Sequence, residues 1–264
     1  MELIDTHCHL DVAAFDADRR QVFDRAQQQG VRRMVIPAVD ADHWAGLTQL
    51  CQSEQTLFPA LGLHPVYLHA HKREDISALE SEIEKHRPVA VGEIGLDYFV
   101  RKLDREKQQV LFEAQLEVAR NVGLPVILHV RKAHDQVLST LRRIRVSGGT
   151  AHAFNGSLQQ AMQYIEMGFK LGFGGMLTYQ RSNRIRRLAE DLPVDAIVLE
   201  TDAPDMVVAA HRGERNSPEY LPHCLRALAD VRNEDVDYLA RQTTINACSV
   251  FALPAMRPSD HVAG

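Results

Sequence analysis

Two histidines, His7 and His9, stand one residue apart just after the first apolar run of the chain, Leu3-Ile4. Side chains two residues apart on an extended strand point to the same side, so both imidazoles should face one point. Neutral imidazole is the commonest metal ligand in proteins. The pair is therefore half of a candidate metal site, although two polar residues that merely end a strand would give the same local pattern.

The same kinds of side chain end other apolar segments. Ligand-type residues at the ends of later predicted strands are His64, Glu93, His129, His152 and Asp202. Mixed imidazole and carboxylate groups without clustered thiolates suit Zn²⁺, Mn²⁺ or Mg²⁺. Because a catalytic zinc keeps only about three protein ligands, this many residues predicts two ions, or three. Glu93 or Asp202 could bridge them.

The elements that must position these residues alternate between two periodicities. Strand-like apolar runs are predicted at 3–9, 33–39, 57–63, 89–97, 126–129, 150–152, 169–173 and 196–202. Helices are predicted at 16–29, 42–53, 75–86, 104–122, 158–167 and 181–190, with another that ends near 145 and a helical remainder to about 251. The apolar face predicted for the helix 104–122 consists of Leu111, Ala114, Val118 and Val122.

Strands that are apolar on both faces and alternate with helices form a parallel sheet. Eight such units in ~250 residues predict an α/β fold, a single (β/α)8 TIM barrel, in which the ligand-bearing strand ends share one mouth. The alternative is an open, doubly wound sheet, which usually has fewer strands and a glycine-rich loop after the first. This chain has His7 and His9 at that place. We expect one domain over residues 1–253 and a frayed tail over 254–264.

Composition restricts the class of protein. The 264 residues are 45% hydrophobic and 25% charged, as in ordinary soluble proteins. The four cysteines are widely spaced and form no CxxC pair, which favours a reducing compartment. No apolar run approaches the ~18 residues of a membrane span, and no leader pattern follows Met1. We predict a cytoplasmic monomer without a membrane or an obligate protein partner.

The formal net charge of −5 means that nucleic acid could bind only through a local basic surface. Basic residues that follow predicted strand ends are Arg101, Lys102, Arg131, Lys132, Arg181, Arg184, Arg212 and Arg215. Aromatic residues in the same segments, which could stack on bases, are Tyr67, Phe99, Phe154 and Tyr179. Arginines such as Arg142 and Arg187 lie on ordinary predicted helix faces, so only part of the basic set is expected to contact a substrate.

Other residues near these motifs are open to two interpretations. His64 could contact a substrate phosphate or make a structural hydrogen bond, and Asp97 could support the site or belong to a loop. Glu200 faces the same way as Asp202 and could ligate an ion or orient a ligand. Cys8 is predicted to be a buried small hydrophobic residue. The histidines assigned to solvated surface are His43, His69, His71, His86, His134, His211, His223 and His261.

The motifs together resemble those of the TatD family of metal-dependent deoxyribonucleases. The principal ones are the HxH pair, GEIGLDY at 92–98 and ETDAP at 200–204. Supporting segments are GLHP at 62–65, HVR at 129–131, HAFNG at 152–156, RNSP at 215–218 and NA at 246–247. The similarity extends over about residues 1–253. AFNG at 153–156 departs from a Cys-Phe-Ser-Gly-like run, which affects substrate detail rather than a ligand.

The resemblance implies an amidohydrolase-superfamily barrel that hydrolyses DNA phosphodiester bonds with divalent metal ions. We predict single-stranded DNA or frayed ends as the substrate. The resemblance assigns metal-ligand roles to His7, His9, Glu93, His129, His152 and Asp202. Two ions would polarise the scissile phosphate and activate a water. Glu93 as the bridging ligand and Asp202 as the acceptor of the water's proton are the predicted catalytic residues. His64 and Arg131 are predicted to contact the substrate, Arg131 by gripping phosphate oxygens.

Two alternative functions belong to other classes. A hydrolase of a small ester, lactone or amide could use the same barrel. Many such barrels bridge their ions with a carboxylated lysine near the fourth strand, where this chain has Glu93, and that favours the nuclease. A catalytically idle interaction protein is disfavoured, because burying so many polar groups without a metal is costly.

Overall fold

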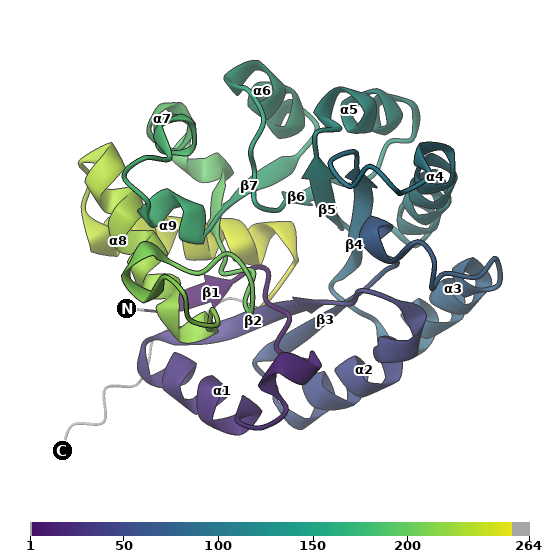
Figure 1. Ribbon diagram of the computed structural model, residues 1–264, viewed down its shortest axis with the longest axis horizontal. Coiled ribbons are helices and arrows are strands. Elements are labelled where there is room, and N and C mark those ends of the chain that lie inside the picture. Colours follow the sequence, from purple (N-terminus) through teal and green to yellow (C-terminus); the bar gives the residue numbers. More distant parts are fainter. Residues whose placement is uncertain (1, 255–264) are drawn as a thin grey trace.

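In the computed structural model, which describes residues 2–254, eight parallel strands form one sheet in sequence order (Figure 1). The strands are β1 (Leu3–Asp5), β2 (Val31–Pro37), β3 (Leu57–Leu61), β4 (Ala90–Asp97), β5 (Val126–Arg131), β6 (Gly149–Ala151), β7 (Phe169–Phe173) and β8 (Ile197–Leu199). Each strand pairs with the next. The predicted (β/α)8 barrel is confirmed, and the doubly wound order is excluded.

Helices surround the sheet as an outer layer (Figure 1). They are α1 (Arg19–Gln28), α2 (Trp44–Ser53), α3 (Asp75–His86), α4 (Arg105–Val122), α5 (His134–Arg143), α6 (Leu158–Glu166), α7 (Asn183–Asp191), α8 (Leu221–Arg232) and α9 (Val236–Val250). Short 3-10 turns are η1 (Ala13–Phe15), η2 (Ala41–His43), η3 (Pro65–Tyr67), η4 (Gly175–Thr178), η5 (Val194–Ala196), η6 (Ala209–His211) and η7 (Pro218–Tyr220). Among the described residues, no helix is long and apolar enough to cross a membrane.

Strand alternation divides the core into two layers. On β2, Val35 packs in an inner cluster, whereas Met34 and Ile36 pack in the larger outer cluster, because successive strand side chains point to opposite faces. The other strand residues of the inner cluster are Ile4, Phe58, Ala60, Ala90, Ile127 and Val198. Phe251 and Leu253, just beyond α9, pack in the same cluster. Apolar side chains thus fill the barrel interior and leave the polar strand ends for the mouth.

Hydrogen bonds join the two ends of the sheet beside the first ligand residues. The backbone N–H of Asp202 donates to the carbonyl of His7 at 2.8 Å. The buried carboxylate of Asp5 accepts from the N–H groups of His7 and Thr201, at 3.2 and 3.0 Å, and from the Thr201 hydroxyl at 2.5 Å. The segments that carry His7 and Asp202 are therefore fixed to each other.

Some predicted elements differ from the structure. The chain after β8 is not one helical remainder: it carries η6 and η7 and then two helices, separated at Asn233, whose φ is 50°. On α4, Val122 of the predicted apolar face is 43% exposed, while Phe112 and Leu116 are buried. Apart from Pro254, the predicted frayed tail lies outside the described residues.

Candidate metal centre

Seven side chains named from the sequence converge at the mouth where the strands end. Their potential ligand atoms fall into three overlapping sets, and within each set the atoms lie no more than 4.8 Å apart. The sets are His7 with Glu93 and His152, His7 with His9 and Asp202, and His64 with Glu93 and His129. The structure thus brings together all six predicted ligands and His64.

Glu93 lies at the centre of this group, and its side chain is only 2% exposed. Its Oε2 atom is 3.1 Å from Nε2 of His7 and 3.5 Å from Nε2 of His9. Its Oε1 atom faces three other imidazole nitrogens at 2.8–3.2 Å, those of His129, His64 and His152. The two carboxylate oxygens therefore face two different groups of imidazoles.

Outer contacts select which nitrogen of a ring faces the centre. The Nδ1–H of His9 donates to the carbonyl of Pro37 at 3.1 Å, which leaves Nε2 for the centre. His129 has the opposite orientation: its Nε2–H donates to Asp97 Oδ2 at 3.1 Å, and Nδ1 faces Glu93. Such partners fix the tautomer and raise the basicity of a metal-binding imidazole. Asp97 therefore contacts a predicted ligand directly and is more than a loop residue.

His64 combines a local structural role with a place in the cluster. Its Nδ1 accepts a hydrogen bond from the N–H of Val66 at 3.1 Å and so caps η3. That bond fixes the ring, and Nε2 lies 3.2 Å from Oε1 of Glu93. The structural hydrogen bond considered from the sequence is present, and the predicted contact with substrate stays a prediction.

Glu200 supports His152 from behind. Its Oε1 atom accepts a hydrogen bond from the N–H of Ala153 at 2.5 Å and lies 3.5 Å from Nδ1 of His152. Gly172 on β7 makes room for this carboxylate, because a Cβ atom there would lie 2.1 Å from Glu200 Oε2. Glu200 lies outside the three ligand sets, so its contacts favour the orienting role over direct ligation.

Strained backbone occurs where the strands deliver these residues. Three non-glycine residues at the mouth have left-handed φ angles of 44–57°: Lys132, Ala153 and Asp202. This conformation costs an L-residue about 1–2 kcal/mol, so surrounding contacts must hold it. Beside Asp202, the Asn216 side chain donates to the carbonyls of Thr201 at 2.8 Å and Asp205 at 2.6 Å.

Two buried glutamines on α4 brace neighbouring strand ends, and the sequence analysis missed both. The Gln108 amide pairs with the backbone N–H and C=O of Asp97 at 2.7 and 3.0 Å. The Gln115 amide pairs with those of Leu63 at 2.7 and 3.1 Å. Their spacing of seven residues, about two helical turns, puts both on one face. That spacing is the signal that could have revealed them.

The donor set fits divalent ions. Nε2 of His7 and Nε2 of His9 are 3.2 Å apart. Two nitrogens bound tetrahedrally to one Zn²⁺ at ~2.0–2.1 Å would be separated by about 3.4 Å. Imidazole nitrogens and carboxylate oxygens are ligand atoms that suit Zn²⁺, Mn²⁺ or Mg²⁺, the ions expected from the sequence. His7, His9 and Asp202 form one group that could hold an ion, and Glu93 belongs to both of the other groups.

Proton affinities within the cluster are strongly perturbed. Burial alone would raise the pKa of Glu93, but the surrounding imidazoles hold it well below its usual range. Burial lowers the pKa of His7 well below its usual value. Burial would also lower the pKa values of His9 and His152, but carboxylates around them, Glu93 foremost, raise these to about 9 and about 10. Protons on imidazoles thus offset the carboxylate charge before an ion binds.

Three other residues differ from their predicted surroundings. Phe154 is 2% exposed and cannot stack on a base. Arg215 forms a two-point contact with Asp18 and lies over the Phe15 ring, so its charge is already engaged. His134 was assigned to the surface but is only 8% exposed. By contrast, Tyr67 and Phe99 are 41% and 48% exposed.

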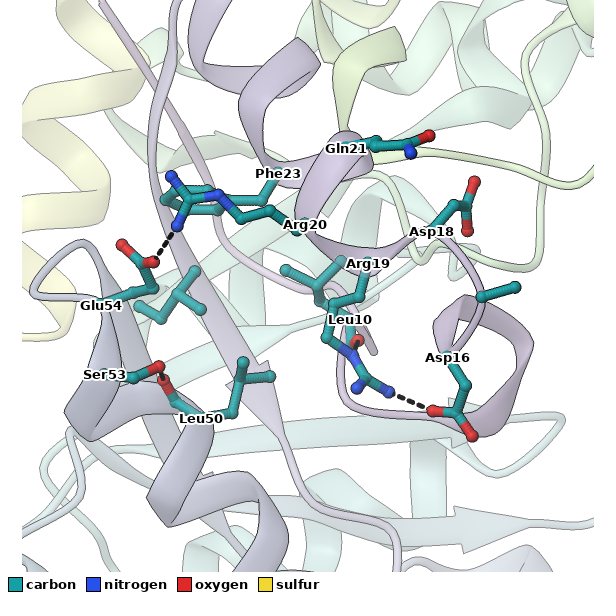
Figure 2. A pocket seen from close by; sticks show the side chains of 12 residues that line it. Leu10, Asp16, Asp18, Arg19, Arg20, Gln21, Phe23, Leu50, Ser53 and Glu54 are labelled. Carbon is teal, nitrogen blue, oxygen red and sulfur yellow. Dashed lines mark hydrogen bonds and ion pairs between the residues drawn. The ribbon is translucent and has the colours of Figure 1, made fainter.

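A concave surface elsewhere in the molecule lacks these features. A pocket of about 480 Å³ lies between α1 and α2, on the side of the barrel (Figure 2). Its charged side chains form ion pairs: Arg19 with Asp16, Arg20 with Glu54, and Asp18 with Arg215 from outside the pocket. No group of metal-ligating residues lies there in the part of the chain that the structure describes.

The chain is similar to known proteins over nearly its whole length. A family model described as TatD related DNase matches residues 4–252. An uncharacterized metal-dependent hydrolase of Escherichia coli K12, YjjV, is 39% identical over 95% of this chain and 98% of its own length. The crystal structure of YjjV, a TatD homologue, superposes with a TM-score of 0.92 over 96% of this chain and 98% of that one. A Pantoea ananatis protein named 3'-5' ssDNA/RNA exonuclease TatD is 30% identical over 95% of this chain and its own full length (100%).

Proposed function

The chain belongs to the family of TatD related DNases, and on that premise we propose that it is a metal-dependent hydrolase that cleaves phosphodiester bonds of DNA. The observation that carries the proposal is the position of Glu93, whose two oxygens face separate imidazole groups. A carboxylate so placed can hold two cations and offset their mutual repulsion. We propose two ions, held by His7, His9, Glu93, His129, His152 and Asp202.

The protein residues around the ions have distinct proposed roles. Divalent ions bound there would polarise the scissile phosphate and lower the pKa of the attacking water. Asp202 is the proposed proton acceptor, because its side chain is 15% exposed toward the mouth. Burial raises the pKa of Asp202 to about 6, which brings the Asp202 carboxylate closer to the operating pH of a general base. His64 adds an imidazole at 3.2 Å from Glu93.

Nucleic acid as the substrate has two sources of support. The relative from Pantoea ananatis carries a name that includes single-stranded DNA and RNA. In this chain, Arg101, Lys102 and Arg131 are exposed in segments that follow β4 and end β5, near the exposed ring of Phe99. Basic groups beside an exposed ring suit a single strand, whose phosphates attract cations and whose bases can stack. We therefore propose single-stranded DNA or frayed ends as the preferred substrate.

The test is cleavage of an end-labelled single-stranded oligonucleotide by protein reconstituted with Mn²⁺ or Zn²⁺. A matched RNA strand, a DNA duplex and a panel of lactones and carboxylic esters form the other arms. We expect metal-dependent shortening of the single strand and loss of that activity with a chelator. Turnover of a lactone or ester with intact DNA would instead assign the barrel to small-molecule hydrolysis.

A further inference from the structure

A second polar pocket opens next to the metal centre. Its volume is about 380 Å³, and its lining includes Phe99, Arg131, Lys132, His134, Asn155 and Arg184. These residues come from the end of β5, the segments that follow β4, β5 and β6, the start of α5, and α7. We call this the basic pocket, because three of its lining residues are cationic and none is acidic.

We propose that the basic pocket binds the phosphate group of a nucleotide adjacent to the one whose ester bond lies at the metal centre. The proposal rests on the proposed nuclease function and adds the place where the strand continues. Arg131 would then hold a flanking phosphate together with Lys132 and Arg184.

The wall of the pocket is attached directly to the metal centre. The Asp97 carboxylate that holds His129 with Oδ2 accepts, with Oδ1, the backbone N–H groups of Phe99 and Val100 at 2.8 and 2.9 Å. Arg131 follows His129 by two residues on β5, so it faces the same side about 6.6 Å further along. A single carboxylate thus fixes both a predicted ligand and the adjoining wall.

The cations of the pocket are available to an anion. In residues 2–254, the salt bridges of arginine and lysine involve side chains other than Arg131, Lys132 and Arg184. Arg131 lies 3.8 Å from the centroid of the exposed Phe99 ring, and Lys132 lies 5.1 Å from it. The ring holds both cations beside each other without neutralising their charge. In a chain with a net charge of −5, such a cluster attracts anions locally.

The floor of the pocket is rigid and neutral. His134 is 8% exposed, and its two ring nitrogens lie 3.3 Å from Tyr164 Oη and from Asn155 Oδ1. Burial lowers the pKa of His134, so the neutral ring accepts from Tyr164 and donates to Asn155. Asn155 is held in turn, because its Nδ2 donates to the carbonyl of Ala153 at 3.0 Å.

The acidic residue Asp135, which follows His134 of the pocket, is already engaged. Asp135 accepts a hydrogen bond from the Gln160 side chain at 2.7 Å, and Gln160 is part of the lining.

The backbone of Lys132 has a left-handed φ of 55°. Non-glycine residues in this strained conformation cluster at ligand clamps. An exposed ring, three unpaired cations and a fixed neutral floor together match a nucleotide phosphate and its adjoining base better than a plain inorganic anion.

The test measures binding separately from cleavage. Fluorescently labelled single-stranded DNA pentamers without terminal phosphates are titrated with protein in the presence of a chelator, so that no cleavage occurs. Fluorescence anisotropy gives Kd at several salt concentrations. The variant is Lys132→Ala with Arg184→Ala, and the control is Arg187→Ala, an exposed arginine on the same helix α7 that lies outside the pocket. We expect Kd to rise at least about tenfold in the double variant and the salt slope to fall by about 0.7, the value for one phosphate on a single strand.

Further arms identify the phosphate and separate the two proposals. Pentamers phosphorylated at the 5′ or 3′ end show whether the loss concerns an internal phosphate, which we expect, or only a terminal one. Equal Kd values and salt slopes in the double variant and in Arg187→Ala would overturn the proposal. If the wild type binds through the pocket but does not cleave DNA with added metal, the nuclease proposal fails and the binding site stands.

Discussion

The metal centre and the pocket between α1 and α2 are both concave and charged, but they differ in how the charges are matched. In the α1–α2 pocket, arginines form ion pairs with nearby carboxylates, as Arg20 does with Glu54 (Figure 2) and with Asp24. At the metal centre, one buried carboxylate, Glu93, lies near five imidazoles. The more deeply buried region carries the groups of metal-ligating side chains.

The difference indicates that buried side chains able to bind an ion mark a functional site better than a concave surface whose charges are paired. An exposed ion pair satisfies both partners at little cost. A buried cluster of this kind is expensive for the fold unless something else binds it. The predictions below test that contrast, starting with the largest expected effect.

The first prediction is that Glu93→Gln removes the function while keeping the fold. The amide preserves the shape of the side chain but loses the charge that offsets repulsion between two dications. We expect loss of one ion and a fall in kcat of at least ~10², the scale for removing a charge-stabilising group. Metal analysis, thermal unfolding and nuclease rates on one preparation measure all three quantities.

The matched variant for Glu93→Gln is Glu54→Gln in the α1–α2 pocket. It makes the same chemical change at a carboxylate that pairs with an exposed arginine. Metal content and kcat should stay at the wild-type values. Two bound ions and full activity in Glu93→Gln would show that Glu93 does not bridge, and the centre would then have to be organised around Asp202.

The second prediction is that metal affinity rises with pH. The pKa values of His9 and His152, raised to about 9 and about 10, mean that protons occupy both imidazoles at neutral pH before metal binds. Ions must displace these protons, so affinity should increase by up to about tenfold per pH unit for each proton released. Glu93, whose pKa is lowered, is already ionised and adds no dependence above pH 5.

Titration calorimetry with Mn²⁺ between pH 6.5 and 8.5, in buffers of different ionisation enthalpy, counts the protons released. A heat of binding that is independent of the buffer would mean that no proton leaves. In that case the protonation assigned to His9 and His152 would be incorrect. The side chains of the α1–α2 pocket are expected to release no protons, because no group of metal-ligating residues lies there among the described residues.

Sequence patterns predicted the barrel and the convergence of seven ligand-type residues. Both predictions depend only on where the strands end in the sequence. A parallel strand delivers its last residues to one mouth whatever the details of its helices. The supporting contacts were harder to predict. Gln108 and Gln115 act from a helix on the backbone of strands before them, and Gly172 acts by lacking a side chain beside Glu200.

His134 and Phe154 show the limit of the same reasoning. Both follow a predicted strand, and their burial depends on packing with Tyr164, at 5.8 and 5.9 Å between ring centroids. Periodicity within one element does not report contacts between two helices and a loop. Sequence therefore predicted which side chains converge at the mouth, and it predicted the surrounding wall poorly.

The third prediction concerns the support behind His152. Glu200→Gln should keep both ions but weaken metal binding or activity by about 10–100-fold, the range for a residue that orients a metal ligand. Gly172→Ala tests the same contact from the other side, because its Cβ would displace the Glu200 carboxylate. If both variants keep wild-type metal affinity and activity, the contact between Glu200 and His152 at 3.5 Å does not contribute to metal binding or catalysis.

The smallest effect is expected on the side of the barrel. Arg20→Ala removes an exposed arginine, 69% of whose side chain is accessible, together with its pairs to Glu54 and Asp24. Exposed ion pairs contribute little because water and salt screen them. We therefore expect Tm to stay within about 2 °C of the wild type, with unchanged metal content and nuclease rate. A clear loss of nuclease activity in this variant would mean that the α1–α2 pocket, despite its matched charges, communicates with the mouth. The contrast between the two regions would then no longer hold.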